Sequence, residues 1–207
     1  MNVDNLRLCL ATNISKHTFL LQVIEGGVTS IQLRAKTLNP VEFYELALVF
    51  KSILQPLNIP LIINDHVDIA IAVDADGVHI GQTDRSPDVV RKQLGATKWI
   101  GLSVETLLDL EKANELDCID YIAASAVFPT QTKTDCKTYW GLDGLQMLVE
   151  RSRYPVVAIG GINQRNINSI VSCGASGVAV VSAINDAANP MQAARSLIHA
   201  MSGDHHV

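Results

Sequence analysis

Short apolar runs alternate with longer amphipathic runs from one end of the chain to the other. This alternation is typical of repeated strand and helix units that build a parallel sheet. We therefore predict eight strands, at Leu6–Ala11, Ser30–Leu33, Leu61–Ile63, Gly77–Ile80, Trp99–Leu102, Tyr121–Ala123, Val156–Ile159 and Gly177–Val181.

Start and stop signals flank the helices predicted between these strands. Asn39 can cap a helix whose first turn contains Pro40, and Glu42 can reach back to the cap. Further helix starts are indicated at Ser86-Pro87-Asp88, Asn163 and Asn189-Pro190. Glycines mark where helices should stop, at Gly26-Gly27, Gly95 and Gly174.

Eight such units in sequence predict an α/β protein that folds as a (β/α)8 TIM barrel. We expect one domain, residues 1–207, in which residues 203–207 form a frayed tail. The chain is shorter than the roughly 250 residues usual for this barrel, so its loops must be compact. An open doubly wound sheet is the alternative, but Ala11-Thr12-Asn13 follows the first strand in place of a glycine-rich turn.

The composition of the chain indicates which kinds of molecule the protein binds. The chain is 48% hydrophobic, and its net charge of −5 gives no general attraction to nucleic acid or to anionic membranes. Four cysteines occur without a CxxC pair, and no apolar run approaches the roughly 18 residues of a membrane span. We expect a reduced cytoplasmic protein that acts on small molecules, without nucleic-acid or membrane partners.

Polar residues at the strand ends carry the candidate chemistry, because reactive groups of such barrels lie at the carboxyl ends of their strands. After the second strand, alternation sends Gln32, Arg34 and Lys36 to one side and gathers an amide and two cations there. A solvated charged loop is the alternative for this segment.

Two acids follow the third and fourth strands. Asn64 and Asp65 end the third strand, and Asp84 follows the fourth. Neighbouring strands lie only about 5 Å apart, so both carboxylates should share one rim. Mg²⁺ would allow both to stay ionised, which predicts a metal site at Asp65 and Asp84. The alternative is that both acids only cap the helices that follow.

The remaining strand ends are rich in hydroxyls and glycines. Ser103 ends the fifth strand, a polar loop with one lysine follows the sixth, and Gly160-Gly161 and Val181-Ser182 end the seventh and eighth. The last two pairs lie where such barrels grip phosphate with backbone N–H groups. His79, inside the fourth strand, is interpreted as a packed, hydrogen-bonded residue rather than a general base.

Six short segments at the predicted strand ends, taken in order, resemble the thiamine-phosphate synthase family. The likeness extends from about Leu6 to Met201. They are IQLRAK (Ile31–Lys36), IIND (Ile62–Asp65), DGVHIGQTD (Asp76–Asp84), GLS (Gly101–Ser103), VFPTQTK (Val127–Lys133) and AIGGI (Ala158–Ile162).

The resemblance implies a (β/α)8 transferase that joins hydroxymethylpyrimidine diphosphate to hydroxyethylthiazole phosphate and releases diphosphate with Mg²⁺. Gln32 would hold the pyrimidine, and Asp65 and Asp84 would bind Mg²⁺. The diphosphate would be held by Asn64 and by the catalytic residues Arg34, Lys36, Ser103 and Lys133. The thiazole phosphate would be held by Thr130, Thr132, Gly161, Val181 and Ser182.

In the route implied for the family, diphosphate leaves first and the thiazole nitrogen captures the resulting cation, so no base is required. This chain differs from the family at two points: His66 replaces an arginine, and Ser125-Ala126 replaces Gly-Pro. His66 is expected to weaken the local positive field or make it pH-dependent. A thiazole tautomerase and a non-catalytic sensor of thiazole phosphate are the alternatives, and a homodimer is a further expectation.

Overall fold

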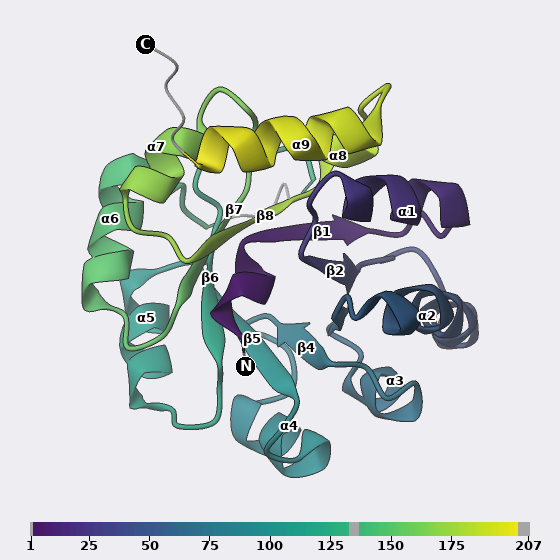
Figure 1. Ribbon diagram of the computed structural model, residues 1–207. Coiled ribbons are helices and arrows are strands. Elements are labelled where there is room, and N and C mark those ends of the chain that lie inside the picture. The colour runs from purple at the N-terminus through teal and green to yellow at the C-terminus, as the bar shows by residue number, and fades with distance from the viewer. Residues whose placement is uncertain (1, 133–136, 203–207) are drawn as a thin grey trace.

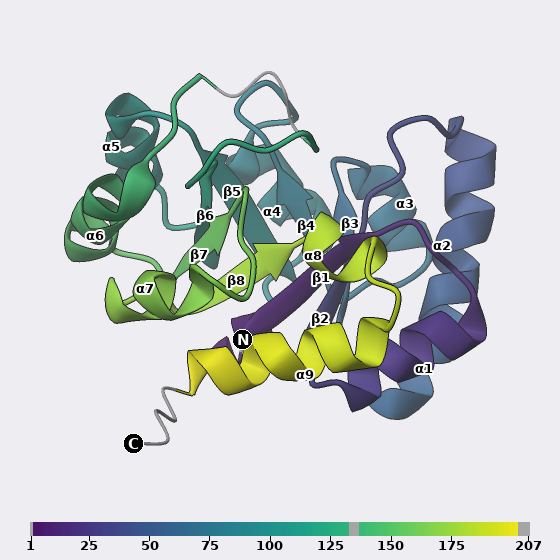
Figure 2. The same ribbon diagram turned by 90° about the horizontal axis from the view of Figure 1, so that it is seen from above.

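Eight parallel strands close into a barrel in the computed structural model, which describes residues 2–132 and 137–202. Each strand pairs with the next along the chain, and β8 pairs with β1. The helices follow one another around the outside in chain order, and α9 packs beside α1 (Figures 1 and 2). The predicted (β/α)8 barrel is confirmed, and the closing pair β1–β8 excludes the open doubly wound sheet.

The strands are β1 Leu8–Thr12, β2 Ser30–Leu33, β3 Leu61–Asn64, β4 Gly77–Ile80, β5 Trp99–Val104, β6 Tyr121–Ser125, β7 Val156–Ile159 and β8 Gly177–Val180. The α-helices are α1 His17–Glu25, α2 Pro40–Leu54, α3 Val67–Ala72, α4 Pro87–Leu94, α5 Leu107–Glu115, α6 Gly141–Arg151, α7 Ile167–Ser172, α8 Ser182–Asn185 and α9 Pro190–Met201. Two short 3₁₀ helices are η1 Val3–Leu6 and η2 Gln55–Leu57.

Alternation along the strands creates two apolar layers. Residues that face outward, such as Ile63, pack against helix side chains such as Phe43 and Phe50 of α2. Residues that face inward fill the barrel itself, and they are Leu6, Cys9, Ile62, Trp99, Tyr121, Val157 and Ala179. Toward the amino ends of the strands, the barrel interior is therefore a packed core, as expected for this fold.

Three of the four cysteines lie in the described part of the chain. Cys9 and Cys118 are buried, Cys173 is partly buried, and all three are free. Burial raises the pKa of the Cys9 thiol to about 11, so that this thiol stays protonated at neutral pH. Cys136 lies outside the described residues.

Most element boundaries are confirmed, and the differences have local causes. Asn39 and Glu42 form a capping box at the start of α2. The first strand begins two residues later than predicted because Leu6 belongs to η1. The predicted helix start at Asn163 is wrong, because its side chain accepts a hydrogen bond from Arg165 N–H in a turn and α7 begins only at Ile167. The predicted tail, residues 203–207, lies outside the described residues.

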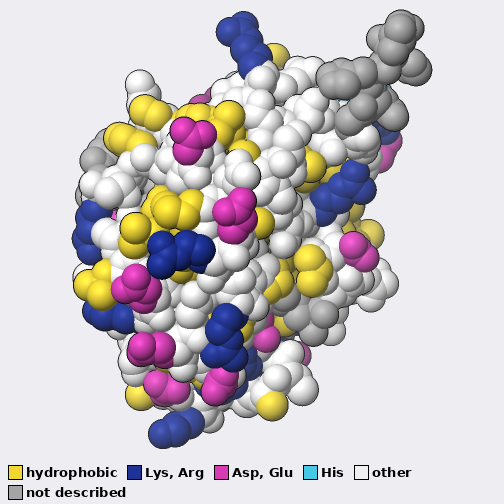
Figure 3. All heavy atoms as spheres, turned by 90° about the vertical axis from the view of Figure 1, so that its left-hand side faces the viewer, with side chains coloured by type: hydrophobic (Ala, Val, Ile, Leu, Met, Phe, Trp, Pro, Cys, Tyr) yellow, Lys and Arg dark blue, Asp and Glu magenta, His cyan; other side chains and the backbone are white. Residues whose placement is uncertain are grey.

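The outer surface on the α5 and α6 side carries acidic and basic side chains intermixed with scattered apolar ones (Figure 3). This mixture gives that face no field of a single sign. Within the described ranges, no helix combines the length and apolar character that a bilayer span requires.

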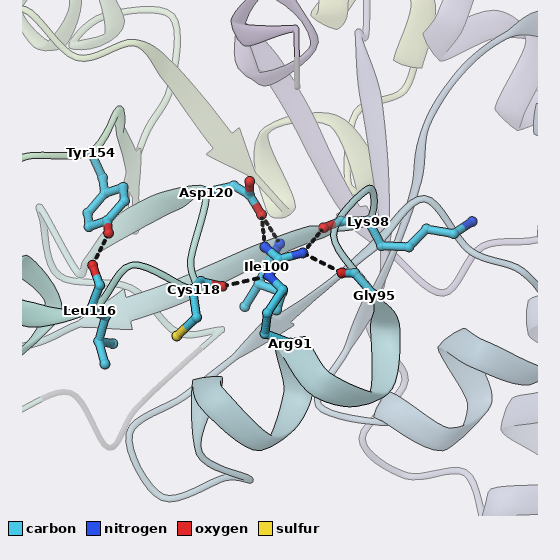
Figure 4. Close-up of polar contacts among 8 residues, drawn as sticks. All are labelled: Arg91, Gly95, Lys98, Ile100, Leu116, Cys118, Asp120 and Tyr154. Atoms are coloured by element: carbon cyan, nitrogen blue, oxygen red, sulfur yellow. Dashed lines mark hydrogen bonds and ion pairs between the residues drawn. The ribbon is translucent and has the colours of Figure 1, made fainter.

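Arg91 of α4 holds the amino ends of β5 and β6 together, at the end of the barrel opposite the polar strand tips (Figure 4). Its guanidinium donates hydrogen bonds to the carbonyls of Gly95, Lys98 and Cys118. It also pairs with Asp120 at 2.6 Å, and the same carboxylate oxygen accepts a hydrogen bond from Ile100 N–H. One side chain thus satisfies several polar groups that the chain turn leaves half-buried.

Replacing Arg91 should therefore cost stability. We expect Arg91→Met to lower the free energy of unfolding by about 2–4 kcal/mol, because it leaves the Asp120 carboxylate and the carbonyls without their donor. Chemical denaturation would measure this change. Arg195→Met is the control: it removes a more exposed ion pair with Glu25 and should cost at most about 1 kcal/mol. Equal losses of unfolding free energy in the two variants would contradict the stabilising role assigned to Arg91.

Candidate active site

A cavity of about 270 Å³ opens at the carboxyl ends of the strands. Every predicted site residue in the described part of the chain lines it, and Lys133 lies outside the described residues. These lining residues are Gln32, Arg34, Lys36, Asn64, Asp65, Ser103, Asp84, Thr130, Thr132, Gly161, Val181 and Ser182. Residues far apart in the sequence thus meet in one place.

The tip of β2 supplies the cationic side of the cavity. Gln32 is buried, Arg34 is half-buried and Lys36 is exposed, so the row runs from the barrel interior out to the rim. Across residues 2–132 and 137–202, no carboxylate forms an ion pair with Arg34 or Lys36. These side chains line the cavity, and their role in binding an anion stays a prediction.

Asp65 and Asp84 meet at the tips of β3 and β4. Burial raises the pKa of Asp65, and the Asp84 carboxyl raises that pKa further through its charge and a hydrogen bond. The cations Lys36 and Arg34 act on the same carboxyl in the opposite direction and lower its pKa. Two acids and two cations therefore lie within electrostatic reach of one another.

Neither acid caps a helix, so the alternative interpretation of this pair is wrong. His66 occupies the N-cap of α3, and Ser86 occupies that of α4. The Asp84 carboxylate instead accepts a hydrogen bond of 2.7 Å from Gly81 N–H. Asp65 adopts a left-handed backbone with φ of 62°, which aspartate tolerates better than most side chains.

The loops after β6 and β7 form another side of the cavity. Gly160 and Gly161 have φ of 99° and 66°, and they follow β7. A Cβ on Gly161 would lie 2.7 Å from the carbonyl oxygen of Pro129, so glycine lets this loop press against the loop after β6. That second loop carries Thr130 and Thr132, which line the same side.

His79 is buried and hydrogen-bonded, as predicted, but it also lines the cavity. Its Nδ1 lies 3.1 Å from the Tyr121 hydroxyl, and its Nε2 lies 2.9 Å from Ser103 Oγ. Both ring nitrogens are thus engaged, which agrees with the interpretation that His79 is not a general base.

Several lining residues were missed at the sequence level, among them Gln82, Glu105 and Lys137. Glu105 is buried and lies two residues beyond Ser103, so the alternation that identified Lys36 could have found it. Gln82 donates a hydrogen bond of 2.6 Å to the Ser103 carbonyl. No periodic pattern marks such a contact between a loop and a neighbouring strand.

His66 does not line the cavity. Its ring is exposed and packs against Phe43 of α2, with 4.6 Å between ring centroids. Any influence of His66 on the cavity's field would therefore act across space, and it stays a prediction.

The donor set suits a hard cation held by few protein ligands. Among residues 2–132 and 137–202, no group of three or more His, Cys, Asp or Glu side chains could hold a metal ion. Two carboxylates completed by water and phosphate oxygens are the arrangement that Mg²⁺ accepts, whereas a structural zinc site needs four protein ligands.

Comparison with known proteins points to one family. A family model described as thiamine monophosphate synthase matches residues 7–184. A thiamine-phosphate synthase of Vibrio parahaemolyticus is 48% identical over 180 residues, which are 87% of this chain and 88% of the relative. Another, from Methanobrevibacter smithii, is 43% identical over 203 residues and covers 96% of both chains.

The solved structure of a thiamine phosphate pyrophosphorylase from Pyrococcus furiosus matches with a TM-score of 0.87. It is 33% identical in sequence, and the match covers 97% of both chains. The resemblance inferred from six short segments is thus confirmed. On these similarities, the chain belongs to the thiamine monophosphate synthase family.

Proposed function

We propose that this thiamine-phosphate synthase joins hydroxymethylpyrimidine diphosphate to hydroxyethylthiazole phosphate in the cavity at the strand tips, releasing diphosphate. The observation that carries the proposal is the meeting of Asp65 and Asp84 with Arg34 and Lys36 on one side of a single cavity. A leaving diphosphate concentrates negative charge, and this is the side that could receive it.

The pyrimidine diphosphate would occupy the β2–β5 side. Gln32 and Asn64 are buried amides that line the cavity floor and can hydrogen-bond the ring and its diphosphate. Arg34 and Lys36 reach further out, where the charged groups would lie. Ser103 and Lys133 would complete the grip on the diphosphate, as the family resemblance implies.

Mg²⁺ would be held by Asp65 and Asp84. Burial and the neighbouring Asp84 carboxyl both raise the pKa of Asp65 and so disfavour its ionised form, and a divalent cation beside the two acids would favour that form. When bound, Mg²⁺ would neutralise part of the charge on the departing diphosphate.

Thiazole phosphate would occupy the other side, with Thr130 and Thr132 along the ring. Backbone groups of Gly161, Val181 and Ser182 would hold its phosphate, because glycine allows the chain to approach an anion closely. The thiazole nitrogen attacks with its lone pair, so no side chain has to remove a proton. The arrangement agrees with diphosphate leaving first, since the residues present stabilise an anion.

The alternatives are less favoured by the cavity. A thiazole tautomerase does not need the diphosphate machinery of Arg34, Lys36 and Asp84, which here lines the cavity together. A non-catalytic sensor of thiazole phosphate would also bind that ligand, so turnover separates it from a synthase. A cytoplasmic location and a homodimer remain predictions.

The first test is metal-dependent turnover. The purified protein should form thiamine phosphate from the two substrates only when Mg²⁺ is present. Asp84→Asn keeps an acceptor for Gly81 N–H but removes the charge, and should lower kcat/KM by roughly 100-fold or more. Asp68→Asn is the matched control, because Asp68 is exposed, pairs with Arg85 and does not line the cavity. Wild-type rates in Asp84→Asn would remove the metal assignment.

A second test uses the raised pKa of Asp65. In metal-free protein the folded state holds this carboxyl ionised at a cost, so Asp65→Asn should raise the free energy of unfolding at pH 7. Asparagine tolerates the left-handed backbone equally well. The gain should shrink as the pH falls through the raised pKa and vanish below the ordinary value of 3.8.

Denaturation of both proteins in chelator over a pH series would measure this gain. Asp68→Asn should change stability in the opposite direction at pH 7, because a hydrogen bond from Arg85 lowers the pKa of Asp68. A loss of stability in Asp65→Asn at pH 7 would contradict the account of the acid pair.

A third test concerns His66. Because its ring packs on Phe43 outside the cavity, His66→Arg should leave the pH dependence of kcat/KM unchanged. Steady-state kinetics over roughly pH 5–8, the range in which histidine side chains usually change charge, would measure this. A profile that loses an ionisation in the variant would show that His66 acts on the site.

A further inference from the structure

Three residues on adjacent strands form a hydrogen-bonded row that runs from the barrel interior to the cavity. Tyr121 of β6 contacts His79 of β4, and His79 contacts Ser103 of β5. Tyr121 and His79 are almost fully buried, whereas Ser103 lines the cavity. Tyr121 itself does not line the cavity at the strand tips. The row thus connects the packed barrel interior to a group that a ligand can touch.

A glycine on the intervening strand makes this row possible. Strand pairing places His79 beside Gly101, and Gly101 beside Tyr121. A Cβ on Gly101 would lie 2.5 Å from His79 Nδ1 and 2.4 Å from the Tyr121 oxygen. Any larger residue would therefore separate the two rings, and glycine lets them meet across β5.

The directions of the hydrogen bonds follow from the phenol. Burial raises the pKa of Tyr121 well above 10, so its hydroxyl keeps its proton. His79 Nδ1 is the one hydrogen-bond partner that the described part of the chain gives this hydroxyl. A buried O–H without an acceptor is costly, so Tyr121 donates to Nδ1. The hydrogen of the neutral imidazole then lies on Nε2, which faces Ser103.

We propose that His79 is a positioning residue: its Nε2–H donates to Ser103 Oγ and so turns the Ser103 hydroxyl proton into the cavity. There it can donate to the diphosphate, and in this respect the inference rests on the proposed function. The Ser103 carbonyl is held separately by the side chain of Gln82. Hydroxyl and backbone of Ser103 are thus fixed by different partners before a ligand arrives.

The opposite tautomer would have a different effect on an anion. Ser103 would then donate to His79 and present only oxygen lone pairs to the cavity, and the Tyr121 proton would have no acceptor. An oriented hydroxyl donor stabilises an anion, whereas oriented lone pairs repel it. The position of one hydrogen in the barrel interior therefore decides how Ser103 meets a diphosphate.

The tautomer can be observed without any substrate. Nitrogen NMR of ¹⁵N-histidine-labelled protein, with the His79 signals assigned by their loss in His79→Gln, should show hydrogen on Nε2 and an unprotonated Nδ1. Hydrogen on Nδ1 would overturn the inference.

A double-mutant cycle tests the consequence for binding. Tyr121→Phe removes only the buried phenol oxygen and releases the constraint on His79. We expect it to weaken binding of inorganic diphosphate, in the presence of Mg²⁺, by about three- to tenfold, the range for one net hydrogen bond. In the Ser103→Ala background the same change should have no further effect, because Tyr121 acts through Ser103.

Tyr154→Phe is the matched control, since Tyr154 donates its hydroxyl to the Leu116 carbonyl away from the cavity (Figure 4). Calorimetry should show unchanged diphosphate affinity in this variant. The inference is overturned if Tyr121→Phe does not weaken diphosphate binding, or if it weakens binding as much in the Ser103→Ala background as in the wild type. In either case, synthesis by the wild type would still support the proposed function. Absence of synthesis in the wild type overturns the proposed function, and the His79 tautomer then decides the positioning role alone.

Discussion

In a closed barrel of parallel strands, every carboxyl end faces the same side, and every second side chain of each strand points inward. The inward positions near the amino ends of the strands hold Cys9, Trp99 and Tyr121, which pack as a core. Inward positions nearer the carboxyl ends hold Gln32 of β2 and Ser103 of β5, which line the cavity. The site is therefore a continuation of the core, and the packing beneath it fixes the positions of its polar groups.

The two ends of the barrel serve different purposes. At the amino ends of the strands, Arg91 satisfies carbonyls and a carboxylate that would otherwise be unpaired. At the carboxyl ends, Asp65 and Asp84 are brought together at a cost, which the raised pKa of Asp65 records. Arg34 and Lys36 offset part of that cost. These opposing charges are the ones that a metal and a diphosphate would satisfy.

The strands and most of the site could be predicted from the sequence, because both depend on local patterns. Apolar runs locate the strands, and polar residues just beyond them locate the rim, as for Asp65. What could not be predicted depends on contacts between distant segments. The bond from Gln82 to Ser103 joins the loop after β4 to strand β5, and His79 reaches Tyr121 only because the residue between them is Gly101. The helix start predicted at Asn163 was wrong for a local reason, because an asparagine side chain can close a turn as well as start a helix.

The central claim is that the acids and cations at the tips of β2, β3 and β4 receive a metal and a diphosphate together. A crystal structure of the protein grown with Mg²⁺ and inorganic diphosphate tests it most directly. The account predicts a metal ion ligated by Asp65 and Asp84 and by diphosphate oxygens, with Arg34 and Lys36 contacting the same diphosphate. Diphosphate bound instead at Gly161 and Ser182, with no metal at the two acids, would contradict it.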